Sequence, residues 1–233
     1  MVAGADEAGR GSLAGPLVAA AVLIDHDTLS LSDRRALAGL HDSKQMTHEH
    51  REELYPCVLR AAARVSVVTR CVPGIDARGL HVTNLEALAA ALDGLDPKGA
   101  ICLVDGFRLG KRGPEHRAVV EGDGRSAAIA AASVVAKVTR DRYMRRACAA
   151  YPDWGFEENV GYSTPEHREA IIKNGISAIH RRSFQSVAYS QLELGSEGIP
   201  DVLVADELVA LAEGHADHVE ADPVAENGRA ALP

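Results

Sequence analysis

Four acidic residues in this sequence follow apolar, strand-like runs, and their chemistry suits a metal-binding site. Asp6 and Glu7 are adjacent and are followed closely by a Gly-Arg-Gly turn, whereas Asp105 and Asp123 each come where a later strand-like run ends. Adjacent carboxylates repel each other unless a cation lies between them, and hard oxygen ligands suit Mg²⁺ or Mn²⁺. Strand ends are also where catalytic groups collect in open α/β sheets. We therefore predict a divalent-cation site at these four residues.

Two other interpretations of these stretches stay open. A single Asp at a strand end is often only a turn former, whose side chain bonds the backbone two residues on. Residues 9–14 also match the G-x-G-x-x-A form of the dinucleotide-binding fingerprint, which would indicate a nucleotide-cofactor enzyme. In that fingerprint the glycines open a helix, whereas residues 17–24 are a short apolar run that indicates a second strand. Asp25 also comes too early for the roughly 20-residue spacing to the ribose-binding acid.

The elements predicted around the four acids alternate between strands and helices, as in an α/β fold. After a very short first strand, further strands are predicted at residues 17–24, 64–72, 99–105 and 117–120. Helices are predicted at residues 33–40, 47–60, 83–92, 125–150 and 164–174. Because Met1 lies so close to Asp6, we expect the true start of the protein to lie upstream.

Local signals refine three of these helices. Residues 83–86, Thr-Asn-Leu-Glu, match a capping box that would open a helix, and Pro56 should kink or split the helix that contains it. In the helix predicted at 125–150, Ser133, Lys137 and Arg140 share one face by their spacing. Such a polar stripe is usually the solvated side of a helix, but here it would point along the same edge as the acids.

The charge of the chain is unevenly distributed. The formal net charge is −8, but residues 191–233 hold ten acidic residues and one basic residue, which leaves residues 1–190 at +1. Since the four acids lie within residues 1–190, the rest of that part carries a basic excess, which is compatible with a phosphate backbone lying across it. We predict one folded domain over residues 1–190 and an acidic, largely disordered tail over residues 191–233.

The cysteines and apolar runs bear on the compartment. The four cysteines lack any C-x-x-C spacing, so zinc and redox motifs are absent and a reducing cytoplasm fits best. No apolar run approaches the roughly 18 residues of a membrane span. A cytoplasmic protein without membrane association is expected, and the lack of an exposed apolar stripe favours a monomer.

Over residues 2–188 the sequence resembles ribonuclease HII, the bacterial type 2 ribonuclease H. The resemblance rests on motifs at residues 6–11, 42–44, 104–106, 122–123, 130–138, 161–164 and 180–184. It implies a ribonuclease H-like α/β fold: a five-stranded mixed sheet flanked by helices, with a helical C-terminal part. It also implies a metal-dependent endonuclease in which Asp6, Glu7, Asp105 and Asp123 bind two Mg²⁺ or Mn²⁺ ions and catalyse phosphodiester hydrolysis.

The same resemblance implies a substrate and the residues that bind it. The enzyme would cut RNA in RNA/DNA hybrids, and would cut 5′ of ribonucleotides embedded in duplex DNA, leaving a 5′-phosphate and a 3′-hydroxyl. Gly9, Arg10 and Gly11 would bring backbone groups against the 2′-hydroxyl that distinguishes RNA from DNA. Tyr162, in the loop before a helix, would stack on the sugar of the next deoxynucleotide. Phosphates are assigned to the residues Ser43, Lys44, Ser133 and Lys137.

A catalytically silent hybrid-binding protein is the main alternative, although a pure binder would gain affinity by losing the four acids. Residues 191–194, Gln-Leu-Glu-Leu, partly resemble a bacterial sliding-clamp peptide but lack its final aromatic residue. A helix end is therefore the preferred interpretation of that segment, with a weak sliding-clamp contact as the alternative. The choice between Mg²⁺ and Mn²⁺ stays open.

Overall fold

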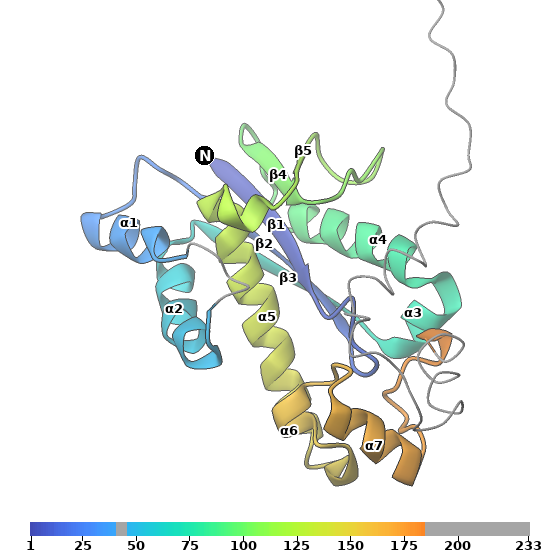
Figure 1. Ribbon diagram of the computed structural model, residues 1–233. Helices are drawn as coiled ribbons and strands as arrows, with labels where there is room; N and C mark the ends of the chain where they lie inside the picture. The colour runs from blue at the N-terminus through green and yellow to red at the C-terminus, as the bar shows by residue number, and fades with distance from the viewer. Residues whose placement is uncertain (41–45, 185–233) are drawn as a thin grey trace, which may run out of the picture. The chain divides into compact units, whose positions relative to one another are not determined.

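The computed structural model describes residues 1–40 and 46–184, and their centre is a five-stranded mixed sheet (Figure 1). The strand order is β3-β2-β1-β4-β5, with β2 antiparallel to both β1 and β3, and β4 parallel to both β1 and β5. The strands are β1 (Val2–Ala8), β2 (Leu17–Ile24), β3 (Arg64–Arg70), β4 (Ile101–Asp105) and β5 (Arg117–Val119). The predicted fold class, a mixed five-stranded sheet with flanking helices, is confirmed.

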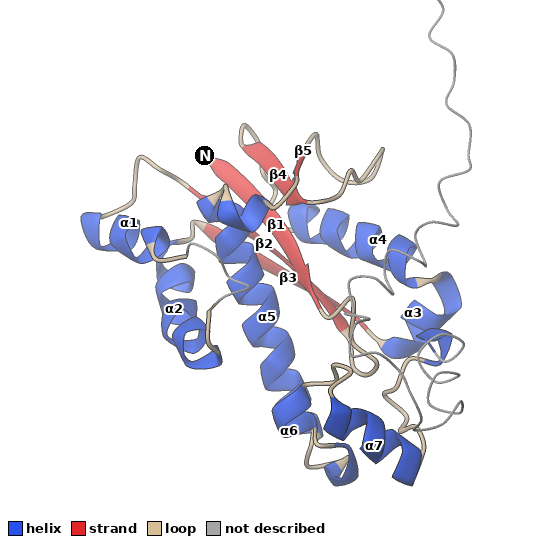
Figure 2. Cartoon of the chain, in the orientation of Figure 1, coloured by secondary structure: helices blue, strands red, loops and turns tan. Residues whose placement is uncertain are grey.

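Helices cover both faces of this sheet (Figure 2). The α-helices are α1 (Leu31–Ala38), α2 (His48–Ala61), α3 (Val72–Arg78), α4 (Leu80–Asp93), α5 (Ala127–Ala147), α6 (Phe156–Asn159) and α7 (Pro165–Asn174). Short 3-10 turns form η1 (Gly122–Gly124), η2 (Pro152–Trp154) and η3 (Arg182–Phe184). One apolar core joins the sheet to α2 and α5, and a second joins its other face to α4. The last helices form the helical C-terminal part that was predicted.

Strand β1 is the element around which both cores are built. Because side chains alternate along a strand, Ala3 and Ala5 pack into the core on the α4 side, whereas Ala8 packs into the core on the α5 side. At Gly4 a Cβ atom would lie 2.2 Å from the backbone of Ala128 in α5, so only glycine fits there. The first turn of α5 therefore lies directly against β1.

The predicted capping box at residues 83–86 is wrong, and Pro56 does not split its helix. Helix α4 begins at Leu80 after the positive-φ residue Gly79, so Thr83 does not cap it, and Glu86 instead accepts a 2.7 Å ion-pair contact from Arg78. Packing of apolar residues against the α4 core extends the helix three residues before the capping pattern. Pro56 lies inside α2, which runs unbroken from His48 to Ala61.

Other sequence predictions have different outcomes. Residues 17–24 form strand β2 rather than a helix, so the glycine-rich run is not a dinucleotide-binding fingerprint and that alternative is wrong. Helix α3 was not predicted. Ser43, Lys44 and the tail with residues 191–194 lie outside the described residues, and the domain boundary at residue 190 stays a prediction. Within the described part of the chain, no helix has the length and apolar character needed to cross a membrane.

Candidate active site

Three of the four predicted acids meet at the shared end of two neighbouring parallel strands. Asp6 and Glu7 are the two residues before the last residue of β1, and Asp105 is the final residue of β4. The strands are paired so that Ala5 lies opposite Val104, which puts Asp6 and Asp105 at the next position of each strand. Asp123 reaches the same region from η1, the turn between β5 and α5, and it acts electrostatically on Asp6.

Backbone N–H groups hold three of these carboxylates. Glu7 N donates to Asp6 Oδ1 at 2.7 Å, and Gly124 N donates to Asp123 Oδ1 at 3.0 Å. Asp105 Oδ1 accepts from Gly122 N at 2.7 Å. A Cβ atom at Gly122 would lie only 3.1 Å from that same Asp105 oxygen, so the glycine lets the turn approach the carboxylate. The acids are thus oriented by the main chain.

Burial and mutual repulsion raise the pKa of two of the acids. Burial raises the pKa of Asp6 to about 7, with a further contribution from the charge of Asp105 and an opposing hydrogen bond from Ser133. Burial also raises the pKa of Glu7 to about 8, and the charge of Asp6 adds to the shift while Arg10 opposes it. Keeping these carboxylates ionised at neutral pH therefore calls for additional positive charge at the site.

The donor atoms fit a hard divalent cation. All four side chains offer oxygen, and within the described residues Glu7 Oε2 is buried without a hydrogen-bond partner. In the side-chain conformations of the structure, no three His, Cys, Asp or Glu residues within 1–40 and 46–184 form a group that could hold a metal ion.

Helix α5 brings two predicted substrate-binding residues alongside the acids. Ser133 is close enough to Asp6 to lower the pKa of that carboxyl through a hydrogen bond. One turn later, Lys137 Nζ lies 3.0 Å from Asp141 Oδ1 and 4.5 Å from the centre of the Tyr162 ring. The structure thus places Ser133, Lys137 and Tyr162 in one row leading away from the acids.

The Gly-Arg-Gly turn returns toward the same acids. Gly9 has φ +92°, and a Cβ atom there would lie 2.1 Å from Arg140 Nε, so glycine is required on both counts. The Arg10 guanidinium lies 3.8 Å from Glu7 Oε1 and 4.4 Å from the centre of the Phe107 ring. Gly11 completes the turn. Arg10 thereby links β1 to the loop that follows β4.

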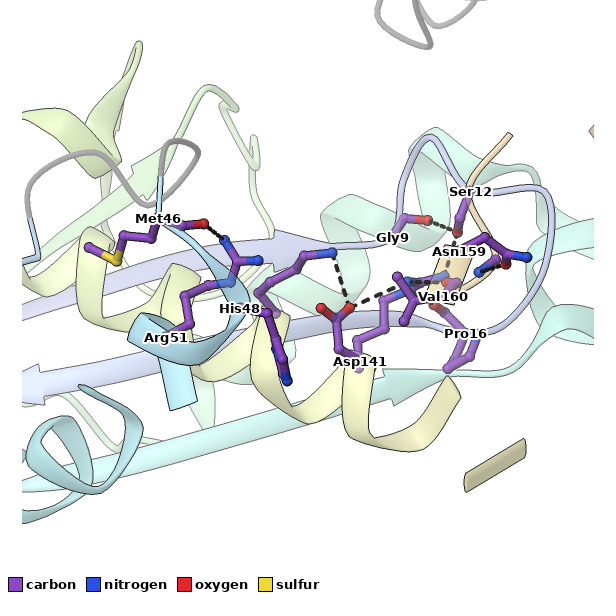
Figure 3. A network of polar contacts seen from close by, with 12 residues as sticks. Gly9, Ser12, Pro16, Met46, His48, Arg51, Asp141, Asn159 and Val160 are labelled. Atoms are coloured by element: carbon purple, nitrogen blue, oxygen red, sulfur yellow. Dashed lines mark hydrogen bonds and ion pairs between the residues drawn. The ribbon is translucent and has the colours of Figure 1, made fainter. Parts of the chain in front are cut away.

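Arg140 connects this turn to the loop that carries Tyr162. The sequence did not predict this role for Arg140. Its side chain is fully buried, not part of a solvated stripe. Nε donates to Pro16 O at 3.0 Å, Nη1 to Val160 O at 2.9 Å, and Nη2 to Ser12 Oγ at 2.7 Å and Ala14 O at 2.9 Å. Figure 3 shows this network around Ser12, Pro16 and Val160. Arg140 therefore positions two segments that lie far apart in the sequence.

A second buried arginine secures the other side of the turn. Arg181 donates from Nε to Gly15 O at 3.0 Å and from Nη1 to Arg10 O at 2.9 Å. Arg181, the first arginine of the motif at residues 180–184, is therefore an internal support of the Gly-Arg-Gly turn.

Two buried histidines hold the main chain at Tyr162. Ser177 N donates to His180 Nδ1 at 2.9 Å, so the proton of a neutral His180 is on Nε2. That Nε2 lies 3.1 Å from His167 Nε2, which must accept, and His167 Nδ1 then donates to Tyr162 O at 2.7 Å. Burial lowers the pKa of both rings, that of His180 to about 4, and the pair is neutral at pH 7.

This pair predicts a loss of stability in acid. An unfolded histidine titrates near pH 6.5, well above folded His180, so the unfolded state binds more protons between about pH 6.5 and 4. Stability from the neutral ring is therefore complete above pH 6.5 and falls with decreasing pH, by at most about 1.4 kcal/mol per pH unit. Urea unfolding at several pH values in this range gives the free energy of unfolding as a function of pH. Its slope against pH should be shallower for His180→Asn than for wild type, and should be unchanged for the exposed control His50→Gln. Equal slopes would contradict the assignment.

Comparisons with known proteins agree on one family. The family model for ribonuclease HII matches residues 3–187. The ribonuclease HII of Sinorhizobium fredii is 46% identical over 191 residues, which cover 82% of this chain and 79% of that protein. The structure of a PCNA:RNase HII complex from Archaeoglobus fulgidus superposes with a TM-score of 0.70 at 29% identity, over 84% of this chain and 98% of that one. Ribonuclease H2 from Pyrococcus horikoshii gives a TM-score of 0.68 at 28% identity, over 83% and 99%.

Proposed function

The chain belongs to the ribonuclease HII family and is a metal-dependent endoribonuclease, and from this premise we propose how its own residues act. We propose that it hydrolyses the RNA strand of RNA/DNA hybrids and cuts 5′ of single ribonucleotides in duplex DNA, leaving 5′-phosphate and 3′-hydroxyl ends. The proposal is carried by one observation: three acids gather at the ends of β1 and β4, and one of their oxygens, Glu7 Oε2, is buried with no hydrogen-bond partner among the described residues.

The residues that would hold the metal are Asp6, Glu7, Asp105 and Asp123, with Mg²⁺ or Mn²⁺ as the cation. Two such ions, when bound, would lower the pKa of the attacking water and stabilise the leaving 3′ oxygen. Ser133 keeps Asp6 oriented through its hydroxyl group, and Arg10 lies beside Glu7. No side chain of the protein needs to act as a nucleophile.

Selectivity for a ribonucleotide would come from the turn and the tyrosine that the two buried arginines support. Gly9 and Gly11 leave room for backbone groups to approach a 2′-hydroxyl, and the Tyr162 ring would stack on the neighbouring deoxyribose. Lys137 and Ser133 lie between the acids and Tyr162, which suits them to the phosphates in between. Ser43 and Lys44 complete the proposed phosphate contacts.

The test is cleavage of three duplexes: DNA with one ribonucleotide, an RNA/DNA hybrid, and all-DNA, each with Mg²⁺, Mn²⁺ or neither. We expect metal-dependent cleavage just 5′ of the ribonucleotide, with all-DNA untouched. Cleavage of the long hybrid alone would still support the carboxylate site, but it would contradict the proposed role of Gly9, Gly11 and Tyr162 in recognising a single ribonucleotide. Binding of hybrid without any cleavage would instead favour a silent hybrid-binding protein.

Further proposals concern the metal, partners and location. We keep both Mg²⁺ and Mn²⁺ as candidates, a monomeric state, and a cytoplasmic location. The archaeal relative of similar fold was solved in complex with PCNA, a fact that supports testing residues 191–194 for a weak sliding-clamp contact. A pull-down of the full chain with a bacterial clamp, repeated after Leu194→Ala, would test that contact.

A basic loop next to Asp105 is suited to the phosphate backbone beyond the cut. The loop of residues 106–116 carries exposed Arg108 and Lys111, neither of which has an ion-pair partner within the described residues. A cavity of about 480 Å³ lies beside them. The loop is fixed from inside, because Leu109 is fully buried and its N–H donates to His116 Nε2 at 2.9 Å.

Removing those two charges should weaken substrate binding in a salt-dependent way. Arg108→Gln/Lys111→Gln is expected to raise KM with little change in kcat. The slope of log KM against log salt concentration should fall by about 0.9 for each lost contact. Lys98→Gln/Lys173→Gln removes two exposed lysines elsewhere and serves as the matched control. An unchanged salt slope in the loop variant would contradict the contact.

A further inference from the structure

Helix α4 carries two buried polar side chains that form no hydrogen bond within the described residues. Thr83 and Asn84 are fully buried, and Thr83 Oγ1 and both polar atoms of the Asn84 amide lack a hydrogen-bond partner in the described chain. A buried amide without partners costs about 1–3 kcal/mol. Most buried polar groups are hydrogen-bonded, so an unsatisfied one calls for a reason such as an absent ion or water. The capping role once expected of these residues does not supply that reason.

Asn84 faces the active site, and Glu7 is the residue it meets there. Helix α4 packs on the face of the sheet to which Ala3 and Ala5 point, and by the alternation of β1 Glu7 points to the same side. Asn84 is near enough to act on the Glu7 carboxyl as a hydrogen-bond donor, although no hydrogen bond of good geometry has formed. Two buried groups with complementary chemistry thus lie next to each other, both unsatisfied.

The two oxygens of Glu7 have different surroundings. Oε1 lies 3.8 Å from the Arg10 guanidinium, whereas Oε2 is the oxygen that is buried without a partner. A carboxylate oxygen has two lone pairs, so Oε2 can accept one hydrogen bond and still ligate a cation. Groups that donate to a metal ligand fix its orientation and commonly change metal affinity by about 10–100-fold when removed.

We infer that Asn84 is a positioning residue for Glu7: when the divalent cation is bound, the Asn84 amide Nδ2 donates to Oε2 and orients that carboxylate toward the ion. This inference rests on the proposed metal site. The amide is kept in an apolar helix face, at a cost in stability, because the carboxylate beside it must hold one orientation. Arg10 supports the carboxylate from the opposite oxygen.

The test compares stability with binding of Mn²⁺ alone, measured from the electron paramagnetic resonance signal of the free ion without substrate. Asn84→Leu removes an unsatisfied polar group, so the melting temperature should hold or rise, while the Kd for Mn²⁺ should increase about 10–100-fold. Thr83→Val is the matched control: it removes the neighbouring unsatisfied hydroxyl, and Mn²⁺ affinity should stay within about twofold of wild type.

The outcomes separate this inference from the proposed metal site. Unchanged Mn²⁺ affinity in a folded Asn84→Leu protein would overturn the role of Asn84 while leaving the site intact. Failure of the wild-type protein itself to bind Mn²⁺ would count against the proposed site instead. If Asn84→Leu does not fold, Asn84→Ser, which lacks the amide and fits the same space, should show the same loss of affinity, and normal affinity there would overturn the inference.

Discussion

Replacing Asp105 by Asn is expected to abolish cleavage while leaving the fold and duplex binding in place. The amide keeps the shape of the carboxylate, and its Oδ1 can still accept from Gly122 N, which is 2.7 Å from the present oxygen. It loses the negative charge that a divalent cation requires. Loss of several kcal/mol of transition-state stabilisation corresponds to a fall in kcat of about 10²–10³-fold or more.

Duplex affinity should be equal or higher in Asp105→Asn, because a negative charge facing the phosphate backbone is removed. Single-turnover cleavage of a duplex with one ribonucleotide, together with a binding titration in Ca²⁺, would measure both effects. Asp27→Asn is the control, since Asp27 is an exposed acid in the loop after β2. Wild-type cleavage by the Asp105→Asn protein would remove the carboxylate-metal assignment.

The four acids of the proposed site could be singled out from the sequence because their signal is local. Each of the four follows a strand-like run within a few residues, and such strand ends are where a sheet exposes side chains to a ligand. What the local pattern could not provide was the pairing of β1 with β4, which puts Asp6 and Asp105 side by side. That register is set by burial of alternate residues on two faces of the sheet, and these contacts are distant in sequence.

The supports of the site were not predictable, for the same physical reason. An arginine on an alanine-rich helix is normally solvated, and Arg140 is buried only because carbonyl groups from residues 14, 16 and 160 converge on it. Thr83 and Asn84 likewise match a capping box in one dimension, but Leu80 packs into the core on the α4 side and starts the helix earlier. Tertiary contacts, which the local sequence does not contain, therefore determine both the burial of Arg140 and the start of α4.

Replacing Arg140 by Met should destabilise the fold strongly. The variant leaves the carbonyls of Pro16, Val160 and Ala14 buried without their donor, and each unpaired buried group of this kind costs about 1–3 kcal/mol. Arg140→Lys should lose less, because an ammonium group on a flexible stem satisfies some acceptors but cannot span the fork. Urea unfolding at neutral pH measures both.

The Arg140→Lys substitution should also change substrate selection, because Arg140 joins the Gly9 turn to the segment before Tyr162. In Arg140→Lys, assayed where the protein is fully folded, preference for a single ribonucleotide over a long hybrid should fall while metal affinity stays near wild type. Exposed Arg142→Gln, on the same helix and paired with Glu52, should cost less than about 1 kcal/mol and leave selectivity unchanged. If Arg140→Lys kept full selectivity despite lost stability, Arg140 would be a support of the fold alone.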